Sequence, residues 1–325
     1  LLDEKDQVVG KTYGYRDGRT QGVDEDVYKI ISEEELYSRT GIQKQSFNTI
    51  YQLMAVKKNN PEHLKAAKNF LMLPDYFHFL LTGQKCSEYT NATSTQLINA
   101  QTNDWDRELI ERLGYPQEMF LPLSQPGTLV GSFTKEIEEE VGFSCEVVLP
   151  ATHDTGSAVM AVPGEGDKNL YISSGTWSLM GIENKTAICT EESRKRNFTN
   201  EGGYEYRYRY LKNIMGLWMI QSVRKELENK YSFAELCAMA SRRSDFPSRV
   251  DVNDPVFLAP DSMIRAIREM CAKTGHPVPE TPDELAAVVY ESLSDSYRET
   301  AEEIEGENLQ KLLFCSNWQS TQNNC

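Results

Sequence analysis

Several stretches of the chain place a polar residue before an apolar run and a glycine after it, which is typical of a capped helix. Ser32-Glu33-Glu34-Glu35 has the spacing of a capping box, and Gly41 can end the short helix that follows. The same pattern predicts further helices over 74–81 (a buried aromatic helix stopped by Gly83), 104–113, 134–141, 262–273 and 281 to about 305.

One longer apolar stripe predicts a single helix over 211–230, because Leu211, Met215 and Trp218 recur at helical spacing. Asn213 and Gln221 would then be about 80° apart around the helix axis, at ~100° per residue. Two amides that border an apolar face could hold the hydroxyl groups of a ligand. They could equally be ordinary solvent-facing positions, and the pattern leaves both readings open.

Strand signals alternate with the helices. Residues 145–149 form a short apolar run, and residues 312–315 form another. Residues 169–173 and 177–182 flank a tight turn that contains Gly175, which predicts a β-hairpin. Strands that alternate with helices indicate an α/β architecture.

The length of 325 residues exceeds what one hydrophobic core usually organises, so two domains are expected. The polar loop at 163–168 precedes the predicted hairpin and marks the expected boundary. The sequence therefore predicts one domain over 1–160 and a second over 161–325.

Composition excludes several classes of partner. The chain has 49 acidic and 34 basic residues, and its net charge of −15 argues against nucleic acid, because phosphate contacts need clustered cations. No apolar run reaches the roughly 18 residues needed to cross a bilayer, so no membrane partner is expected. Seven cysteines without a C-x-x-C motif, and four scattered histidines, favour the reduced thiols of a cytoplasmic protein over a disulfide framework or a metal cluster.

The first candidate for chemistry is the segment from Pro150 to Ala158, where an apolar strand ends and a helix must begin. In open α/β sheets, ligands bind at the carboxyl ends of strands. Asp154 at this position could accept a proton from a substrate hydroxyl. It could also merely cap the helix, which is the usual role of Asp there.

Two further segments carry weaker signals. The hydroxyl groups and Gly175 in the turn at 173–178 suit a phosphate, although a plain turn has the same chemistry. The two arginines and Asp17 in the segment 15–20 could form part of a substrate wall, or a salt-bridged corner. The chain has no P-loop, no complete dinucleotide-binding fingerprint and no G-x-S-x-G or H-E-x-x-H motif.

Taken together, these segments resemble the FGGY family of carbohydrate kinases, and the resemblance covers nearly the whole chain. No single stretch is decisive, but their order and spacing are specific. The matching stretches are YRDGRT (15–20), LPDYF (73–77), EYTNAT (88–93), HDT (153–155), SSGTWSLM (173–180), NFTNEGG (197–203), LKNIMGLW (211–218), FLAP (257–260) and PVPET (277–281).

The resemblance implies a two-lobed α/β fold of the actin-like ATPase (ribonuclease H-like) type, with a sugar-binding first lobe and a nucleotide-binding second lobe. It implies that the γ-phosphoryl group of ATP, with Mg²⁺, is transferred to the 1-hydroxyl of L-rhamnulose in rhamnose catabolism. Alternatives are another ketose of the family, such as L-xylulose or L-fuculose, or a sugar-binding relative without catalysis. The residues that match the family's functional positions are Asp154 (general base), His153, Thr155 and Asn213 (sugar contacts), Thr176 (near the ATP phosphates) and Gln221 (nucleotide side).

The chain departs from the family pattern at both ends. The family begins with a glycine-rich strand–turn–strand that carries an Asp, and this segment is absent before Leu1. A triple-glycine turn for adenosine follows the family's strand that corresponds to 312–315, whereas residues 315–325 contain no glycine. We therefore expect this chain to be an incomplete piece with little kinase activity, and to expose surfaces that favour association.

Overall fold

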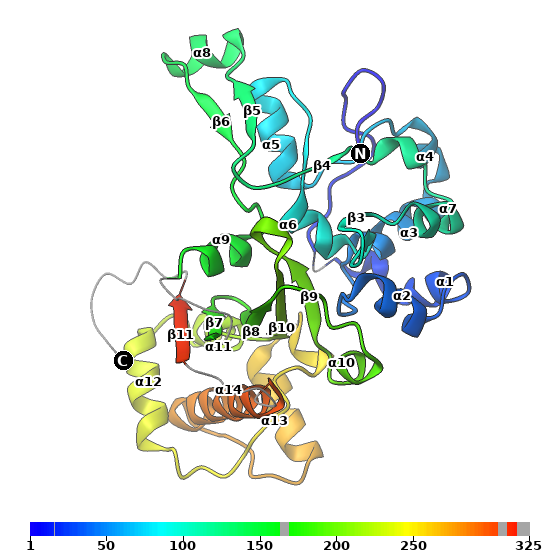
Figure 1. Ribbon diagram of the computed structural model, residues 1–325. Helices are drawn as coiled ribbons and strands as arrows, with labels where there is room; N and C mark the ends of the chain where they lie inside the picture. Colours follow the sequence, from blue (N-terminus) through cyan, green and yellow to red (C-terminus); the bar gives the residue numbers. More distant parts are fainter. Residues whose placement is uncertain (16, 163–168, 305–310, 317–325) are drawn as a thin grey trace. The chain divides into compact units, whose positions relative to one another are not determined.

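A computed structural model describes residues 1–15, 17–162, 169–304 and 311–316 (Figure 1). The chain divides into two compact units, of which unit 1 comprises Leu1–Ala161 with Glu183–Leu211, and unit 2 comprises Val162–Ile182 with Lys212–Cys325. Arg16 and the loop at 163–168 lie outside the described residues, as does the glycine-free segment after Ser316. None of the described helices combines the length and the apolar character that crossing a membrane requires.

Unit 1 is built mainly from short helices around one apolar core. Its helices are α1 (Asp24–Tyr28), α2 (Glu33–Thr40), α3 (Thr49–Asn59), α4 (Pro61–Ala66), α5 (Leu73–Thr82), α6 (Tyr89–Ala92), α7 (Arg107–Leu113), α8 (Lys135–Val141), α9 (Asp154–Met160) and α10 (Glu191–Lys195). Its strands are β1 (Ser87–Glu88), β2 (Ile98–Asn99), β3 (Asp104–Trp105), β4 (Leu123–Ser124), β5 (Leu129–Ser132), β6 (Glu146–Val148) and β9 (Thr199–Gly202). The core includes Val27, Ile50, Tyr51, Leu109 and Ile110, each fully buried.

The remaining elements are three strands, then four helices and a last strand. They are β7 (Asn169–Ser174), β8 (Ser178–Asn184), β10 (Tyr208–Ile214), α11 (Trp218–Glu226), α12 (Phe233–Arg242), α13 (Met263–Lys273), α14 (Pro282–Ile304) and β11 (Lys311–Ser316). The five-stranded sheet has the order β11-β7-β8-β10-β9, with β11 parallel to β7 and β7 antiparallel to β8. The predicted hairpin and the predicted last strand are confirmed.

Most of the predicted helices are confirmed by their caps. The Ser32 hydroxyl accepts a hydrogen bond from the backbone N–H of Glu35 at the start of α2, and Gly41 ends that helix in the left-handed conformation. Helices α8, α13 and α14 also begin and end within a residue or two of the prediction. Helix α7 begins later than predicted, at Arg107, because Asp106 rather than Asp104 caps it.

The predicted single helix over 211–230 is wrong. Residues 208–214 form strand β10, which pairs antiparallel with β9, and helix α11 begins only at Trp218. Gly216 separates the two elements with a φ of 62°, a left-handed conformation that interrupts a helix. The helical spacing of the apolar residues therefore arises from a strand, a turn and a helix in succession.

Helix α5 begins and ends within one residue of the predicted limits, but the prediction that it is a buried aromatic helix is wrong. Its apolar residues Leu73, Phe77 and Leu80 are 58%, 54% and 46% exposed. The side chain that the helix buries completely is the carboxylate of Asp75. Helix α5 thus turns an acid toward the interior of unit 1.

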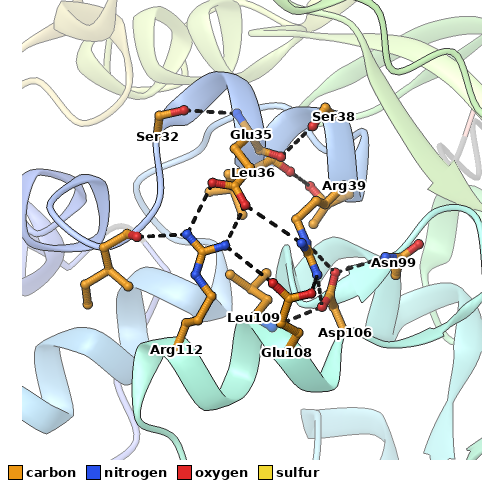
Figure 2. A network of polar contacts seen from close by, with 12 residues as sticks. Ser32, Glu35, Leu36, Ser38, Arg39, Asn99, Asp106, Glu108, Leu109 and Arg112 are labelled. Carbon is orange, nitrogen blue, oxygen red and sulfur yellow. Dashed lines mark hydrogen bonds and ion pairs between the residues drawn. The ribbon is translucent and has the colours of Figure 1, made fainter.

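A network of charged side chains joins α2 to α7 (Figure 2). The Arg39 guanidinium donates two hydrogen bonds of 2.8 Å to the two carboxylate oxygens of Asp106. Asp106 also accepts from the backbone N–H of Leu109 at 3.0 Å, and so caps α7. Burial alone would raise the pKa of Asp106, but the hydrogen bonds from Arg39 and Leu109 outweigh it and lower the pKa.

Candidate functional site

The loop before α9 is held by a buried carboxylate. Glu88 has no solvent exposure, and its Oε2 accepts hydrogen bonds from the backbone N–H of Thr152 at 3.0 Å and from the Thr152 hydroxyl at 2.6 Å. The Thr90 hydroxyl donates to the same Oε2 at 2.6 Å and accepts from the backbone N–H of His153 at 3.4 Å. Two residues from the distant segment around β1 and α6 therefore fix the loop that carries His153.

The imidazole of His153 lies among charged side chains from β9 and β10. Its Nδ1 is 3.4 Å from Nη1 of Arg209, and its Nε2 is 3.7 Å from a carboxylate oxygen of Glu201. Arg209 is 1% exposed, pairs with Glu201 at 3.3 Å and donates to the carbonyl of Gly202 at 3.1 Å. Burial lowers the pKa of His153, the Glu201 carboxylate opposes that shift, and Arg209 adds to it.

Asp154 is the first residue of α9, and the cap position belongs to His153, whose side chain makes no capping bond. The reading in which Asp154 caps the helix is therefore wrong. One Asp154 carboxylate oxygen accepts from the backbone N–H of Thr155 at 2.6 Å. The Asp154 side chain remains 80% exposed, so its carboxylate is accessible to a ligand. The next residue, Thr155, is buried and helps to hold the backbone in place.

In unit 2, the β7–β8 turn is locked to the turn that precedes α11. The backbone N–H of Trp218 donates to the carbonyl of Thr176 at 3.1 Å, and that of Leu217 donates to the carbonyl of Gly175 at the same distance. Gly216 makes this approach possible, because a Cβ atom there would lie 2.5 Å from the backbone nitrogen of Ser178. Thr176 is exposed at the end of the turn.

The predicted site residues fall in both units. His153, Asp154 and Thr155 are consecutive in unit 1. Thr176, Asn213 and Gln221 belong to unit 2, where Thr176 lies at the β7–β8 turn and Gln221 in the first turn of α11. Asn213 lies on strand β10, so the expectation that Asn213 and Gln221 border one helix face is wrong.

Residues 17–20 form a corner in unit 1, and Arg16 lies outside the described residues. Asp17 accepts from the backbone N–H of Arg19 at 2.9 Å, and Arg19 donates to the side-chain oxygen of Gln52 at 2.6 Å. Arg19 also lines a cavity of about 780 Å³ together with Leu2, Phe70 and other residues of the unit. The corner is confirmed by the ion pair between Arg19 and Asp17, and the substrate wall stays a prediction.

Sequence reasoning assigned no role to four residues that support the His153 loop: Glu88, Thr90, Glu201 and Arg209. Glu88, Thr90 and Glu201 lie in the stretches 88–93 and 197–203, whose resemblance to the family could have indicated that these residues have a role. Arg209 stands in none of these stretches. Arg209 is buried and contacts the imidazole of His153, and only the tertiary structure reveals this contact.

Two family profiles match the chain, one in each half of the sequence. The profile of the N-terminal domain of the FGGY family of carbohydrate kinases matches residues 1–161, and the profile of the C-terminal domain of that family matches residues 170–315. The chain is 55% identical over 305 residues to a rhamnulokinase of Halalkalibacterium halodurans and 52% identical over 305 residues to one of Oceanobacillus iheyensis. These alignments cover 94% of this chain but 65% and 64% of the relatives, so the chain spans less than two thirds of their length.

Among solved structures, the chain is similar to a ligand-bound xylulose kinase from Lactobacillus acidophilus, with a TM-score of 0.75 and 16% identity. That alignment covers 98% of this chain and 65% of the solved one. The likeness, together with the two domain matches, confirms the expected actin-like ATPase fold.

Proposed function

The chain belongs to the FGGY family of carbohydrate kinases, and from that premise we propose that it takes part in ATP-dependent phosphorylation of L-rhamnulose at the 1-hydroxyl, which yields L-rhamnulose 1-phosphate. The identity of 55% and 52% to two rhamnulokinases favours this sugar over other ketoses. The observation that carries the catalytic part is the exposed carboxylate of Asp154 on a loop held by buried Glu88.

In this proposal Asp154 is the general base. An exposed carboxylate can orient a sugar hydroxyl and accept its proton as the phosphoryl group is transferred. The rigid attachment of the loop supports this role, because phosphoryl transfer depends mainly on positioning. His153, Thr155 and Asn213 would contact the sugar, and Thr176 and Gln221 would lie on the nucleotide side.

Mg²⁺ accompanies ATP in this family's reaction, and it would neutralise charge on the phosphates when bound. In the described ranges, the one cluster of three metal-ligating side chains is Asp75, His78 and Cys86. Sulfur and imidazole ligands do not suit Mg²⁺, which prefers oxygen. That cluster therefore does not fit Mg²⁺, and no step is assigned to a protein-bound magnesium ion.

We expect Asp154→Asn to lower kcat by about 10²–10⁴-fold, the usual contribution of general-base catalysis. ADP release would be measured with Mg-ATP and L-rhamnulose, L-xylulose or L-fuculose, for this chain and for a form extended to the length of its relatives. The matched control is Asp261→Asn, because the Asp261 side chain is 95% exposed in unit 2.

Full turnover by Asp154→Asn would remove the general base from the proposal. If L-xylulose or L-fuculose were the best substrate, the sugar assignment would be wrong while the kinase remained. If neither form turned over any ketose, the chain would be a sugar-binding relative without catalysis.

A further inference from the structure

Three side chains with metal-binding atoms, two from α5 and one from the residue before β1, lie close together. Asp75 and His78 are three residues apart on α5 and so share one face of the helix. Cys86 lies immediately before β1, after the chain has turned back at Gly83. The carboxylate oxygen, the imidazole nitrogen and the sulfur all lie within 4.8 Å of one another.

Two side-chain atoms of this cluster that could bind a metal are buried without a hydrogen-bond partner among the described residues. Asp75 is fully buried, and while its Oδ1 accepts from the backbone N–H of Glu88 at 3.2 Å, its Oδ2 has no partner. The Nδ1 atom of His78 is likewise buried and without a partner. A buried polar atom left in this state costs about 1–3 kcal/mol, so the arrangement indicates a missing ligand.

We propose that Asp75, His78 and Cys86 bind one zinc ion. Zn²⁺ takes thiolate sulfur, imidazole nitrogen and carboxylate oxygen as ligands, so each of the three side chains suits it. Bonds of about 2.0–2.3 Å to a tetrahedral ion place ligand atoms roughly 3.3–3.7 Å apart, so small side-chain rotations would close the site. The fourth position would be taken by water, because the Glu88 carboxylate is engaged by Thr90 and Thr152.

Zinc binding at these three side chains is coupled to the release of protons. Binding forms three bonds to the metal and releases the Cys86 thiol proton to solvent, together with the Asp75 proton when that group carries one. The thiolate and the carboxylate then balance the charge of Zn²⁺.

The ion would be structural and would act on the His153 loop only through the protein. It would tie α5 to the residue that precedes β1, and the next residues lead to Glu88. Because Asp75 accepts from the Glu88 backbone and Glu88 accepts from Thr152, the ion would support the carboxylate that fixes the loop.

The test is metal content, which does not depend on catalysis. The chain would be stripped with a chelator, dialysed against ZnCl₂ or CoCl₂, and analysed by mass spectrometry for bound metal and by absorption for a thiolate-to-cobalt band. Cys86→Ser and His78→Asn remove one ligand each. The matched controls are Cys145→Ser and His276→Asn, both at exposed positions.

We expect one zinc ion per chain in the parent protein and in both controls, a thiolate band that Cys86→Ser abolishes, and at least tenfold weaker binding in both ligand variants. No stoichiometric binding by the parent chain, or undiminished binding by both ligand variants, overturns the proposal. Circular dichroism identifies a variant that fails to fold. If one ligand variant fails to fold, the zinc site is tested by the cobalt spectrum of the parent chain and by the metal content of the other ligand variant. A negative result leaves the proposed kinase function untouched, since no measurement here uses turnover.

Discussion

His153 lies among charged side chains that act on its ring in opposite directions. Glu201 on β9, Asp154 on α9 and the more distant Glu88 favour the protonated ring, while burial and Arg209 on β10 disfavour it. The balance lowers the pKa of His153 below the value of 6.5 expected for an unfolded chain. The neutral imidazole is therefore the form that the folded protein favours near neutral pH.

The sign of the resulting pH dependence follows from proton counting. Below pH 6.5 the unfolded chain binds a proton at His153 that the folded chain does not, so acidification favours unfolding. The parent should lose free energy of unfolding when the pH is lowered from 7.5 to 5.5. We expect this loss to be about 1 kcal/mol smaller in His153→Gln, as measured by urea denaturation at both pH values. His276→Gln, at an exposed position, should match the parent; equal losses in His153→Gln and the parent would contradict the prediction.

The junction between β10 and α11 depends on one glycine. Gly216 has a φ of 62°, and an added Cβ would lie 2.5 Å from the backbone nitrogen of Ser178 and 2.6 Å from the carbonyl carbon of Trp177. Backbone atoms cannot move aside as a flexible side chain can. The close approach therefore requires glycine for reasons of space as well as conformation.

We expect Gly216→Ala to lower the free energy of unfolding by about 2–5 kcal/mol, from left-handed strain and overpacking together. Gly22→Ala is the matched control, because Gly22 has a φ of 72° but nothing within 4 Å of an added Cβ. Gly22→Ala should lower the free energy of unfolding by only about 1–2 kcal/mol, because it adds left-handed strain without overpacking. Denaturant unfolding of both variants gives the comparison, and equal costs would mean that crowding at Gly216 is unimportant.

Helices α2 and α7 are joined by the ion pair between Arg39 and Asp106. Arg39→Leu should lower the free energy of unfolding by about 2–3 kcal/mol, because the Asp106 side chain is 2% exposed and would lose its partner (Figure 2). Arg298→Leu removes a 57% exposed arginine from α14 and should cost much less than Arg39→Leu, because exposed ion pairs contribute little to stability. In an Asp106→Asn background the effect of Arg39→Leu should shrink, and an unchanged cost would show that the pair is not its source.

Local chemistry explains which elements could be predicted from the sequence. Helices with a polar cap and a terminal glycine, such as α2 and α8, have their ends determined by neighbouring residues. Strand β10 depends instead on pairing with β9, which no pattern within 208–214 reveals. The exposure of α5 was missed for a related reason, since apolar content predicts burial only when another element covers it.

Across the whole chain, the cysteines differ widely in their surroundings. All five cysteines whose side chains the structure describes are free. Cys145 is exposed and Cys271 is buried, while burial raises the pKa of Cys86 and of Cys189 to about 11. Because the thiolate is the reactive form, the four cysteines should be alkylated at different rates.

We expect Cys145 to be alkylated at least tenfold faster than Cys86, Cys189 and Cys271 when the native chain is treated with a small maleimide at pH 7.5. Peptide mass spectrometry at successive times gives the individual rates. In Cys145→Ser the fastest of these modifications should disappear while the other three rates stay unchanged. Rapid labelling of Cys271 in the native chain would contradict its burial.

The candidate site could be predicted only in part. Asp154 stands where a strand ends and a helix begins, and that position in the sequence is enough to suggest chemistry. The residues that hold its loop come from 88–90 and 201–209, and their contacts depend on how distant segments fold together. Arg209 carried no signal of its own, because a lone arginine in a strand is ordinarily a surface residue.

The discontinuous composition of unit 1 has a consequence for the order of events during synthesis. Its first 161 residues include Glu88 and Asp154, but Glu201 and Arg209 are added only after the chain has passed through the first part of unit 2. Arg209 follows His153 by 56 residues (209 − 153), which at ~5–20 residues per second is a delay of about 3–11 s. During that interval the nascent chain can already anchor Thr152 through Glu88, while the imidazole of His153 still lacks its contacts with Glu201 and Arg209.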